Sequence, residues 1–202
     1  FKLSGDKWLG IHLGMTGSLH INSSNYQNHK HDALILYQSN QALVFKDPRQ
    51  FGRLRLHTGK TPPSWWSELP TSMLDPQFKL SILSNALSRH GKRPVKALLL
   101  DQRYFQGMGN WMADEVLWRS GIHPGRLGSK INPAECANLF SQIKLVVRGA
   151  MKSVGKHGGD PPKGWLFHVR WKNGGICPKT QSLLKREEIG GRTSCWCPKL
   201  QK

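Results

Sequence analysis

Short apolar runs alternate with turn-forming residues over the first 58 positions of the chain. Five of these runs have the length and composition of strands, and Gly, Asn and Ser separate them. Ser39 and Asn40 suit the tip of a hairpin. The pattern predicts an antiparallel sheet or sandwich with strands at 8–13, 18–21, 33–37, 42–45 and 53–57.

The pattern changes after residue 58, where Pro, Ser and Trp dominate and four prolines prevent any long element before residue 77. Beyond this segment the apolar positions recur with a helical period. Asp75-Pro76 suits a cap and first-turn pair, and Asn132-Pro133 with Glu135 predicts a capping box. Helices are therefore expected from 76 to about 88, over 94–100, from 110 to before Gly121, and from 133 through an apolar face that includes Leu139, Phe140, Ile143, Val147 and Met151.

The end of the chain returns to a strand-like pattern, from residue 165 to 202, with Gly190-Gly191 turning a hairpin between 179–188 and 193–198. The fold class is therefore α+β with several domains. We expect an N-terminal antiparallel β-sandwich over 1–60, a linker over 61–75, a helical domain over 76–155, and a loop with a β-hairpin over 156–202.

The charge is strongly positive and spread along the chain: 30 Lys and Arg against 12 Asp and Glu give a formal charge of +18. Basic side chains placed on phosphates release condensed counterions, so a polyanion is the expected partner. Charge alone also allows a generic RNA-binding or ribosomal protein. No apolar run approaches the ~20 residues of a membrane span, so we expect a monomeric, intracellular protein without membrane contact.

Residues 106–110, Gln-Gly-Met-Gly-Asn, place two glycines where a helix is expected to begin. Free amides at a helix N-terminus, with the Asn110 side chain beside them, bind anionic oxygens. The simpler interpretation is a corner between two helices that Asn110 merely caps.

This corner belongs to an ordered series of segments: LLDQ at 99–102, GMGN at 107–110, ADE at 113–115 and GIHP at 121–124. Two further blocks, HLGMTG at 12–17 and DPRQFG at 47–52, precede it, and GGRT at 190–193 with CPK at 197–199 and Gln201 follows. The series closely resembles the formamidopyrimidine-DNA glycosylase/endonuclease VIII family, whose helical part is a helix-two-turns-helix domain. The resemblance covers nearly the whole chain.

The resemblance implies roles for individual residues. An enzyme of this kind extrudes a damaged nucleotide from duplex DNA and fills the space that it leaves. The void-filling wedge corresponds to Met15, Arg49 and Phe51. Contacts to phosphates correspond to His12, Asn110 and Arg192, and the side of the site that faces DNA and the lesion corresponds to Lys96, Gly107 and Gly109.

The C-terminal finger departs from the family pattern, in which four cysteines in two Cys-x2-Cys pairs hold zinc. Here Thr180 and Leu200 stand where partners of Cys177 and Cys197 would be, and Cys195 alternates to the other side of its strand. We therefore expect a zinc-free finger without cofactor, held by hairpin hydrogen bonds and by packing of aromatic residues such as Trp171 and Trp196. Three cysteines with a histidine such as His168 are the alternative metal site.

The beginning of the chain also departs from the pattern, because the family's nucleophile is an N-terminal proline followed by glutamate, whereas this sequence opens Phe1-Lys2-Leu3. We expect a segment to be missing there and assign no catalytic residue. The implied function is a DNA repair glycosylase and abasic-site lyase that acts on duplex DNA with oxidised or ring-opened bases or abasic sites. It would work in the cytoplasm or nucleoid of a bacterium, or in a nucleus.

A non-catalytic relative that only recognises damaged DNA is the alternative. The segment 154–165 is short and rich in Gly and Pro. Because family members that grip 8-oxoguanine tend to have a longer loop there, oxidised pyrimidines or ring-opened purines are at least as good candidates.

Overall fold

The computed structural model describes residues 1–155 and 158–202, which form two compact units, Phe1–Glu68 and Leu69–Lys202. The division between them falls within the segment 61–75. The hairpin at the end of the chain belongs to the second unit.

The first unit consists of two three-stranded antiparallel sheets. One has the order β1-β2-β6, from Lys2–Leu3, Lys7–His12 and Arg53–Thr58. The other has the order β3-β5-β4, from Ser18–Ser23, Gln41–Lys46 and Asp32–Tyr37. The five expected strands are confirmed, and β1 is an addition. Residues 39 and 40 do form the turn of the β4-β5 hairpin.

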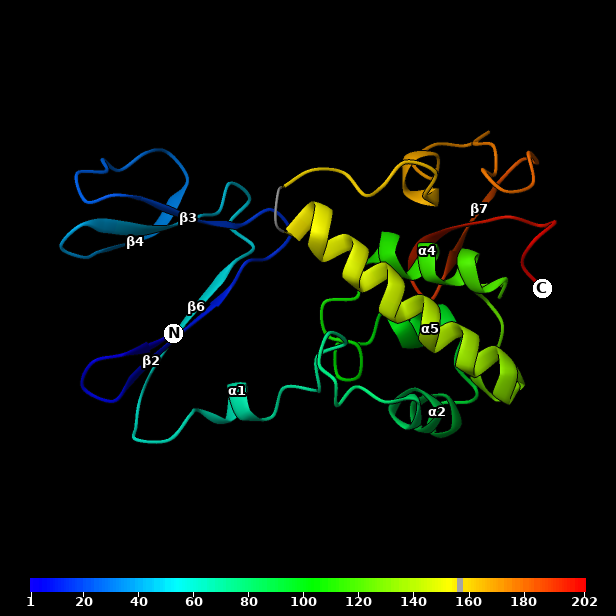
Figure 1. Cartoon of the computed structure of the whole chain (residues 1–202), viewed down its shortest axis with the longest axis horizontal. Coiled ribbons are helices and arrows are strands. Elements are labelled where there is room, and N and C mark those ends of the chain that lie inside the picture. Colours follow the sequence, from blue (N-terminus) through cyan, green and yellow to red (C-terminus); the bar gives the residue numbers. More distant parts are fainter. Residues whose placement is uncertain (156–157) are drawn as a thin grey trace. The chain divides into compact units, whose positions relative to one another are not determined.

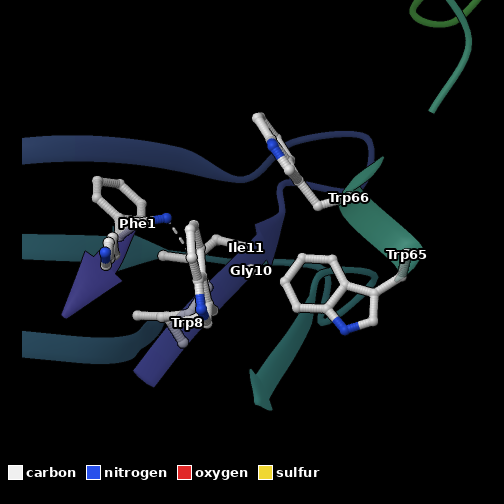
Figure 2. A pocket seen from close by; sticks show the side chains of 8 residues that line it. Phe1, Trp8, Gly10, Ile11, Trp65 and Trp66 are labelled. Atoms are coloured by element: carbon white, nitrogen blue, oxygen red, sulfur yellow. Dashed lines mark hydrogen bonds between the residues drawn. The ribbon is translucent and has the colours of Figure 1, made fainter. Parts of the chain in front are cut away.

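The core of the first unit lies around the central strand β5, on which Ala42, Val44 and Phe45 are buried. The short helix α1 (Ser64–Ser67) follows β6 in the proline-rich segment. Trp65 and Trp66 of α1, together with Phe1, Trp8 and Ile11, line a hollow of about 370 Å³ beside β2 (Figure 2). Trp65 approaches β2 where a glycine leaves room: a Cβ on Gly10 would lie 2.6 Å from its ring.

The second unit is mostly helical, with α2 (Leu80–Arg89), α3 (Val95–Leu99), α4 (Asn110–Ser120) and the long α5 (Pro133–Ala150) (Figure 1). These helices share one apolar core. Helix α4 ends where Gly121 adopts a left-handed conformation, φ +72°. Helix α5 begins with the expected capping box between Asn132 and Glu135. None of the helices in the described residues is both long enough and apolar enough to cross a lipid bilayer.

Two details of the second unit differ from the expectation. Helix α2 starts at Leu80, because Asp75 accepts the N–H of Gln77 (2.7 Å) and so closes a turn before the helix. Met151 is half exposed and lies beyond α5 in a π-helical turn, Met151–Gly155. Of the glycine-rich loop 154–165, residues 156 and 157 lie outside the described residues.

The C-terminal segment contains less strand than its composition predicts. Turns and the 3₁₀ helix Leu166–His168 occupy most of 165–184, and the hairpin consists only of β7 (Lys185–Ile189) and β8 (Arg192–Trp196). The turn does lie at Gly190-Gly191, with φ +62° and +76°. The beginning of the expected strand 179–188 instead follows a turn, in which the N–H of Gln181 donates to the carbonyl of Cys177 at 3.0 Å and Gln181 has φ +53°.

Candidate nucleic-acid interface

Two loops of the first unit meet and present apolar side chains to solvent. Met15, after β2, is 72% exposed, and Phe51, before β6, is 52% exposed. The loops touch through their backbones: a Cβ on Gly14 would lie 2.7 Å from the carbonyl carbon of Phe51. The first two of the sequence blocks therefore form one surface, which we call the wedge loops (residues 12–17 and 47–52).

Buried groups brace the second wedge loop from below. Asp47 is 5% exposed, and its Oδ2 accepts the N–H of Gly52 at 2.7 Å. A Cβ on Gly52 would lie 2.6 Å from the ring of Phe45, so only glycine fits there. The guanidinium of Arg49 lies 4.7 Å from the centroid of the Phe51 ring, close enough for a cation–π contact. Arg49 and Phe51 therefore project together from a braced loop.

His12 is the last residue of β2 and pairs with Arg53 at the beginning of β6. Its Nδ1 accepts the N–H of Gly14 at 3.1 Å, which ties the exposed imidazole to the first wedge loop. The residue that resemblance assigns to a phosphate thus shares one surface of the first unit with Met15, Arg49 and Phe51.

In the second unit, the glycine-rich corner forms the entrance to α4. Met108 is only 1% exposed, and its side chain anchors the corner in the core. A Cβ on Gly107 or on Gly109 would meet nothing within 4 Å, so their open side faces away from the protein. Gly109 has ordinary extended backbone (φ −90°), so nothing in the chain itself requires a glycine there. Close approach of another molecule to this backbone would require it.

Gln102 fixes the shape of this corner. Its Oε1 accepts the N–H of Gly107 at 2.8 Å, and its Nε2 donates to the carbonyl of Met108 at 3.1 Å. Gln102 belongs to the LLDQ segment of the sequence motif, but the sequence analysis predicted no role for its side chain. A side-chain amide beside a glycine-rich turn is the signal that suggests such a brace.

Asn110 and the hairpin meet at one backbone carbonyl. The Nδ2 of Asn110 donates to the carbonyl oxygen of Thr193 at 3.0 Å, and Thr193 directly follows the exposed Arg192. Asn110 is the first residue of α4, whereas Gly109 occupies the N-cap position without a side-chain cap. The capping role of Asn110 that the simpler interpretation allowed is therefore wrong, and the structure brings Asn110 close to Arg192.

Lys96 lies beside them but is completely buried. Its ammonium pairs with Asp114 and donates to the carbonyl of Thr193 at 3.1 Å. Burial lowers the pKa of Lys96, and the carboxylate of Asp114 opposes this change. The lysine that resemblance places near the lesion thus holds the hairpin in this structure, and its ammonium has no exposed surface with which to contact DNA.

Asp114 and Glu115 of α4 are buried and form ion pairs, although the sequence analysis predicted no role for either. Asp114 also accepts from Arg170, and Glu115 accepts from Arg119 at 2.7 Å and from the N–H of Phe167 at 3.2 Å. Burial raises the pKa of Glu115 despite Arg119. Adjacent carboxylates among apolar neighbours predict such partners, because an unpaired buried charge is very costly.

The finger packs around a tryptophan of α4. Trp118 is 1% exposed and donates its indole N–H to the Sγ of Cys177 at 3.3 Å. Trp171, expected as a packing residue, is instead 54% exposed. Trp196 does pack, edge to face, against His123 at 4.2 Å between ring centroids.

The positions that resemblance associates with zinc are connected by hydrogen bonds. Thr180 Oγ1 lies 3.2 Å, and Ser182 Oγ 3.4 Å, from the Sγ of Cys197. Burial raises the pKa of Cys197, but these hydrogen bonds outweigh it and lower the pKa to about 7. Cys195 faces the other way, and its backbone N–H donates to Asp114.

No group of three or more His, Cys, Asp and Glu side chains suited to a metal occurs among residues 1–155 and 158–202. The alternative metal ligand His168 lies 2.9 Å from the carbonyl oxygen of Pro161.

Comparison with known proteins agrees with these features. Residues 1–54 match the model of the formamidopyrimidine-DNA glycosylase N-terminal domain, and residues 69–159 match that of the formamidopyrimidine-DNA glycosylase H2TH domain. A Synechocystis protein named formamidopyrimidine-DNA glycosylase is 30% identical over 96% of the chain and 72% of its own length. The chain belongs to the formamidopyrimidine-DNA glycosylase family. An Arabidopsis thaliana member of the same name is 31% identical, and the chain spans 55% of its length.

Solved structures of formamidopyrimidine-DNA glycosylases show the same fold. The chain superposes with a TM-score of 0.80 on MutM in complex with DNA that contains carbocyclic 8-oxo-G, at 26% identity over 98% of this chain and 75% of that one. The Lactococcus lactis enzyme in complex with FAPY-dG-containing DNA gives 0.82 at 24% identity, over 98% and 76% of the two chains. These matches confirm the α+β class, with its N-terminal sandwich and helix-two-turns-helix domain. This is a family of DNA repair glycosylases.

Proposed function

We propose that the protein binds duplex DNA that contains oxidised or ring-opened bases or abasic sites, and extrudes the damaged nucleotide. The observation that carries this proposal is the exposure of Met15 and Phe51 on braced loops that touch through Gly14. Large apolar side chains held rigidly in solvent contribute little to stability, but they can part a base step. The family relationship supplies the duplex as partner, and the charge of +18 suits it.

Each unit has its own part in this proposal. The wedge loops fill the stack: Met15 is flexible and apolar, Phe51 opens a base step, and Arg49 donates to the base left without its partner. His12 binds a phosphate from the same surface. In the second unit, Arg192, Asn110 and the open backbone of Gly107 and Gly109 bind the phosphates beside the extruded nucleotide.

The finer activity is a bifunctional one, glycosylase and abasic-site lyase. An amine attacks C1′ of the sugar, the base leaves, and the resulting Schiff base permits cleavage of the strand by β-elimination. In the family this amine is that of an N-terminal proline followed by glutamate, and none of the 202 residues is assigned the role. The wedge loops and the phosphate-binding residues of the second unit bind and orient the DNA.

Trapping tests this activity. The full-length protein with its native N-terminus is incubated with borohydride and duplexes that carry 8-oxoguanine, a formamidopyrimidine, 5-hydroxyuracil or an abasic site. We expect covalent protein–DNA adducts, with the formamidopyrimidine or the oxidised pyrimidine at least as reactive as 8-oxoguanine, because loop 154–165 is short. Tight binding of lesion duplexes without adducts would instead identify a non-catalytic damage-recognition protein.

A further inference from the structure

One edge of strand β8 pairs with β7, and its other edge, which pairs with no strand among residues 1–155 and 158–202, faces α3 and α4. Strand β7 pairs with β8 so that Arg192 and Ser194 are opposite Ile189 and Glu187. Because backbone groups alternate along a strand, Thr193 and Cys195 direct their N–H and C=O to the same edge. Unpaired backbone groups that are buried at an edge need other partners.

Side chains of the helices supply those partners. The Thr193 carbonyl accepts from Lys96 at 3.1 Å and from Asn110 at 3.0 Å. The Cys195 N–H donates to Asp114 Oδ2 at 3.0 Å. The other oxygen of Asp114 pairs with Lys96, so one carboxylate, whose side chain is 0% exposed, connects both ends of this edge.

Two further contacts complete the attachment. Arg170 Nε donates to Asp114 Oδ2 at 3.1 Å, which brings the segment before the hairpin into the same network. At the turn, a Cβ on Gly190 would lie 2.7 Å from the Cβ of Ala97, so the tip rests directly on α3. Gly191 has open space around it. The hairpin is thus fixed along one edge and at its tip.

We propose that Asp114 and Lys96 are positioning residues for phosphate binding: by fixing the Thr193 carbonyl, they place Arg192 beside Asn110 so that the two donors bind one stretch of backbone together. This inference rests on the proposed function. It goes beyond it, because Lys96 then acts through the hairpin rather than on the lesion.

A buried ion pair is by itself weak evidence for a role in stability, since apolar replacements are often as stable. Here the pair binds two backbone groups of β8 close to Arg192. Lys96 donates to the carbonyl of Thr193, and Asp114 accepts the N–H of Cys195. An apolar cluster would fill the same volume, but it has no donor that could fix the position of the Thr193 carbonyl by a directed hydrogen bond. This difference makes the role testable.

The test measures the affinity of the purified protein for a duplex with a tetrahydrofuran abasic analogue at several KCl concentrations. The variants are Lys96→Met, Arg192→Ala and the double variant. Each lost phosphate contact lowers the slope of log Kd against log salt by about 0.9. We expect Arg192→Ala and Lys96→Met each to lower the slope by about that amount and to weaken binding about tenfold. In the Arg192→Ala background, Lys96→Met should change Kd less than about twofold.

Two further variants separate positioning from stability. Lys96→Arg keeps a cation that can reach both Asp114 and the Thr193 carbonyl, and should retain the wild-type slope even if its Tm falls. Arg126→Met removes the Arg126–Glu135 pair of the same unit, whose other hydrogen bonds go to the backbone of Lys130 and Asn132 and not to the hairpin, and should leave Kd and slope unchanged. If Lys96→Met does not fold, Asp114→Asn takes its place in the same cycle.

The outcomes are distinct. Equal losses from Lys96→Met in both backgrounds, or a wild-type slope in Lys96→Met, would overturn the positioning role. If the wild-type protein shows no preference for the abasic-analogue duplex over an undamaged one, the proposed function itself fails.

Discussion

Gly14 and Phe51 are in backbone contact, although 37 positions separate them: a Cβ at Gly14 would stand 2.7 Å from the Phe51 carbonyl carbon. Gly14 also has φ +66°. Gly14→Ala should therefore force the wedge loops apart and destabilise the protein by about 1–3 kcal/mol. Preference for lesion duplexes should fall, while affinity for undamaged duplex stays nearly constant; fluorescence anisotropy with both duplexes measures this.

Gly5→Ala is the matched control, because Gly5 has nearly the same φ, +68°, but open space where a Cβ would stand. It should cost about 1 kcal/mol from backbone conformation alone and leave lesion preference intact. The same loss of preference in both variants would mean that the Gly14–Phe51 contact does not support the wedge.

The wedge and phosphate residues should give different binding phenotypes. Phe51→Ala or Met15→Ala should reduce discrimination between lesion and undamaged duplexes, with the salt slope unchanged. Asn110→Ala should weaken binding to all duplexes alike but leave the salt slope nearly unchanged, because an uncharged amide on a phosphate releases no counterion. Titrations of both duplexes at three salt concentrations check this, and a loss of affinity confined to the lesion duplex would argue against a phosphate contact by Asn110.

The Trp65 ring occupies the space above Gly10 (Figure 2). Gly10→Ala places a methyl group 2.6 Å from that ring, so the indole must move. We expect a loss of about 1–3 kcal/mol in unfolding free energy and a shift in tryptophan emission. Gly159→Ala, with nothing within 4 Å, should change neither; equal effects in the two variants would exclude the proposed steric cause.

Asp101 should make stability fall in acid. Its carboxylate accepts hydrogen bonds from Arg103 and Arg93, which hold its pKa well below the usual range. A lowered folded-state pKa stabilises the protein above the unfolded value, near 3.9, and this contribution disappears as pH falls through the folded pKa. The difference in unfolding free energy between wild type and Asp101→Asn should therefore shrink from pH 5 to pH 2 in urea titrations. A constant difference would contradict this.

Five strands of the first unit and the capped helices could be predicted from sequence because their signals are local, whereas β1 and α1 were not predicted. Short apolar runs between turn residues define β2 to β6, Gly121 ends α4, and the pair Asn132 and Glu135 starts α5. The segment between Trp165 and the C-terminal hairpin could not, since Gly174-Gly175 and Pro178 interrupt it and leave no regular period. Its conformation depends on packing against Trp118, which lies some fifty positions earlier.

The candidate site follows the same division. The motif residues Met15, Phe51, Asn110 and Arg192 could be located from sequence, but the contacts that hold them could not. Nothing in the neighbouring sequence indicates that Lys96, on a helix in a basic chain, is completely buried. That outcome depends on Asp114, eighteen positions later, and on a carbonyl of the final hairpin.

The fastening of β8 to the helices has an energetic consequence for recognition. A recognition element that is mobile until its target arrives must give up conformational entropy on binding, at about 0.5–1.5 kcal/mol for each side chain that becomes ordered. Here the strand that carries Arg192 is already immobilised in the free protein by Asp114 and Lys96. Its preorganisation leaves only the guanidinium to be ordered by an incoming phosphate, which favours fast engagement during a search along undamaged DNA.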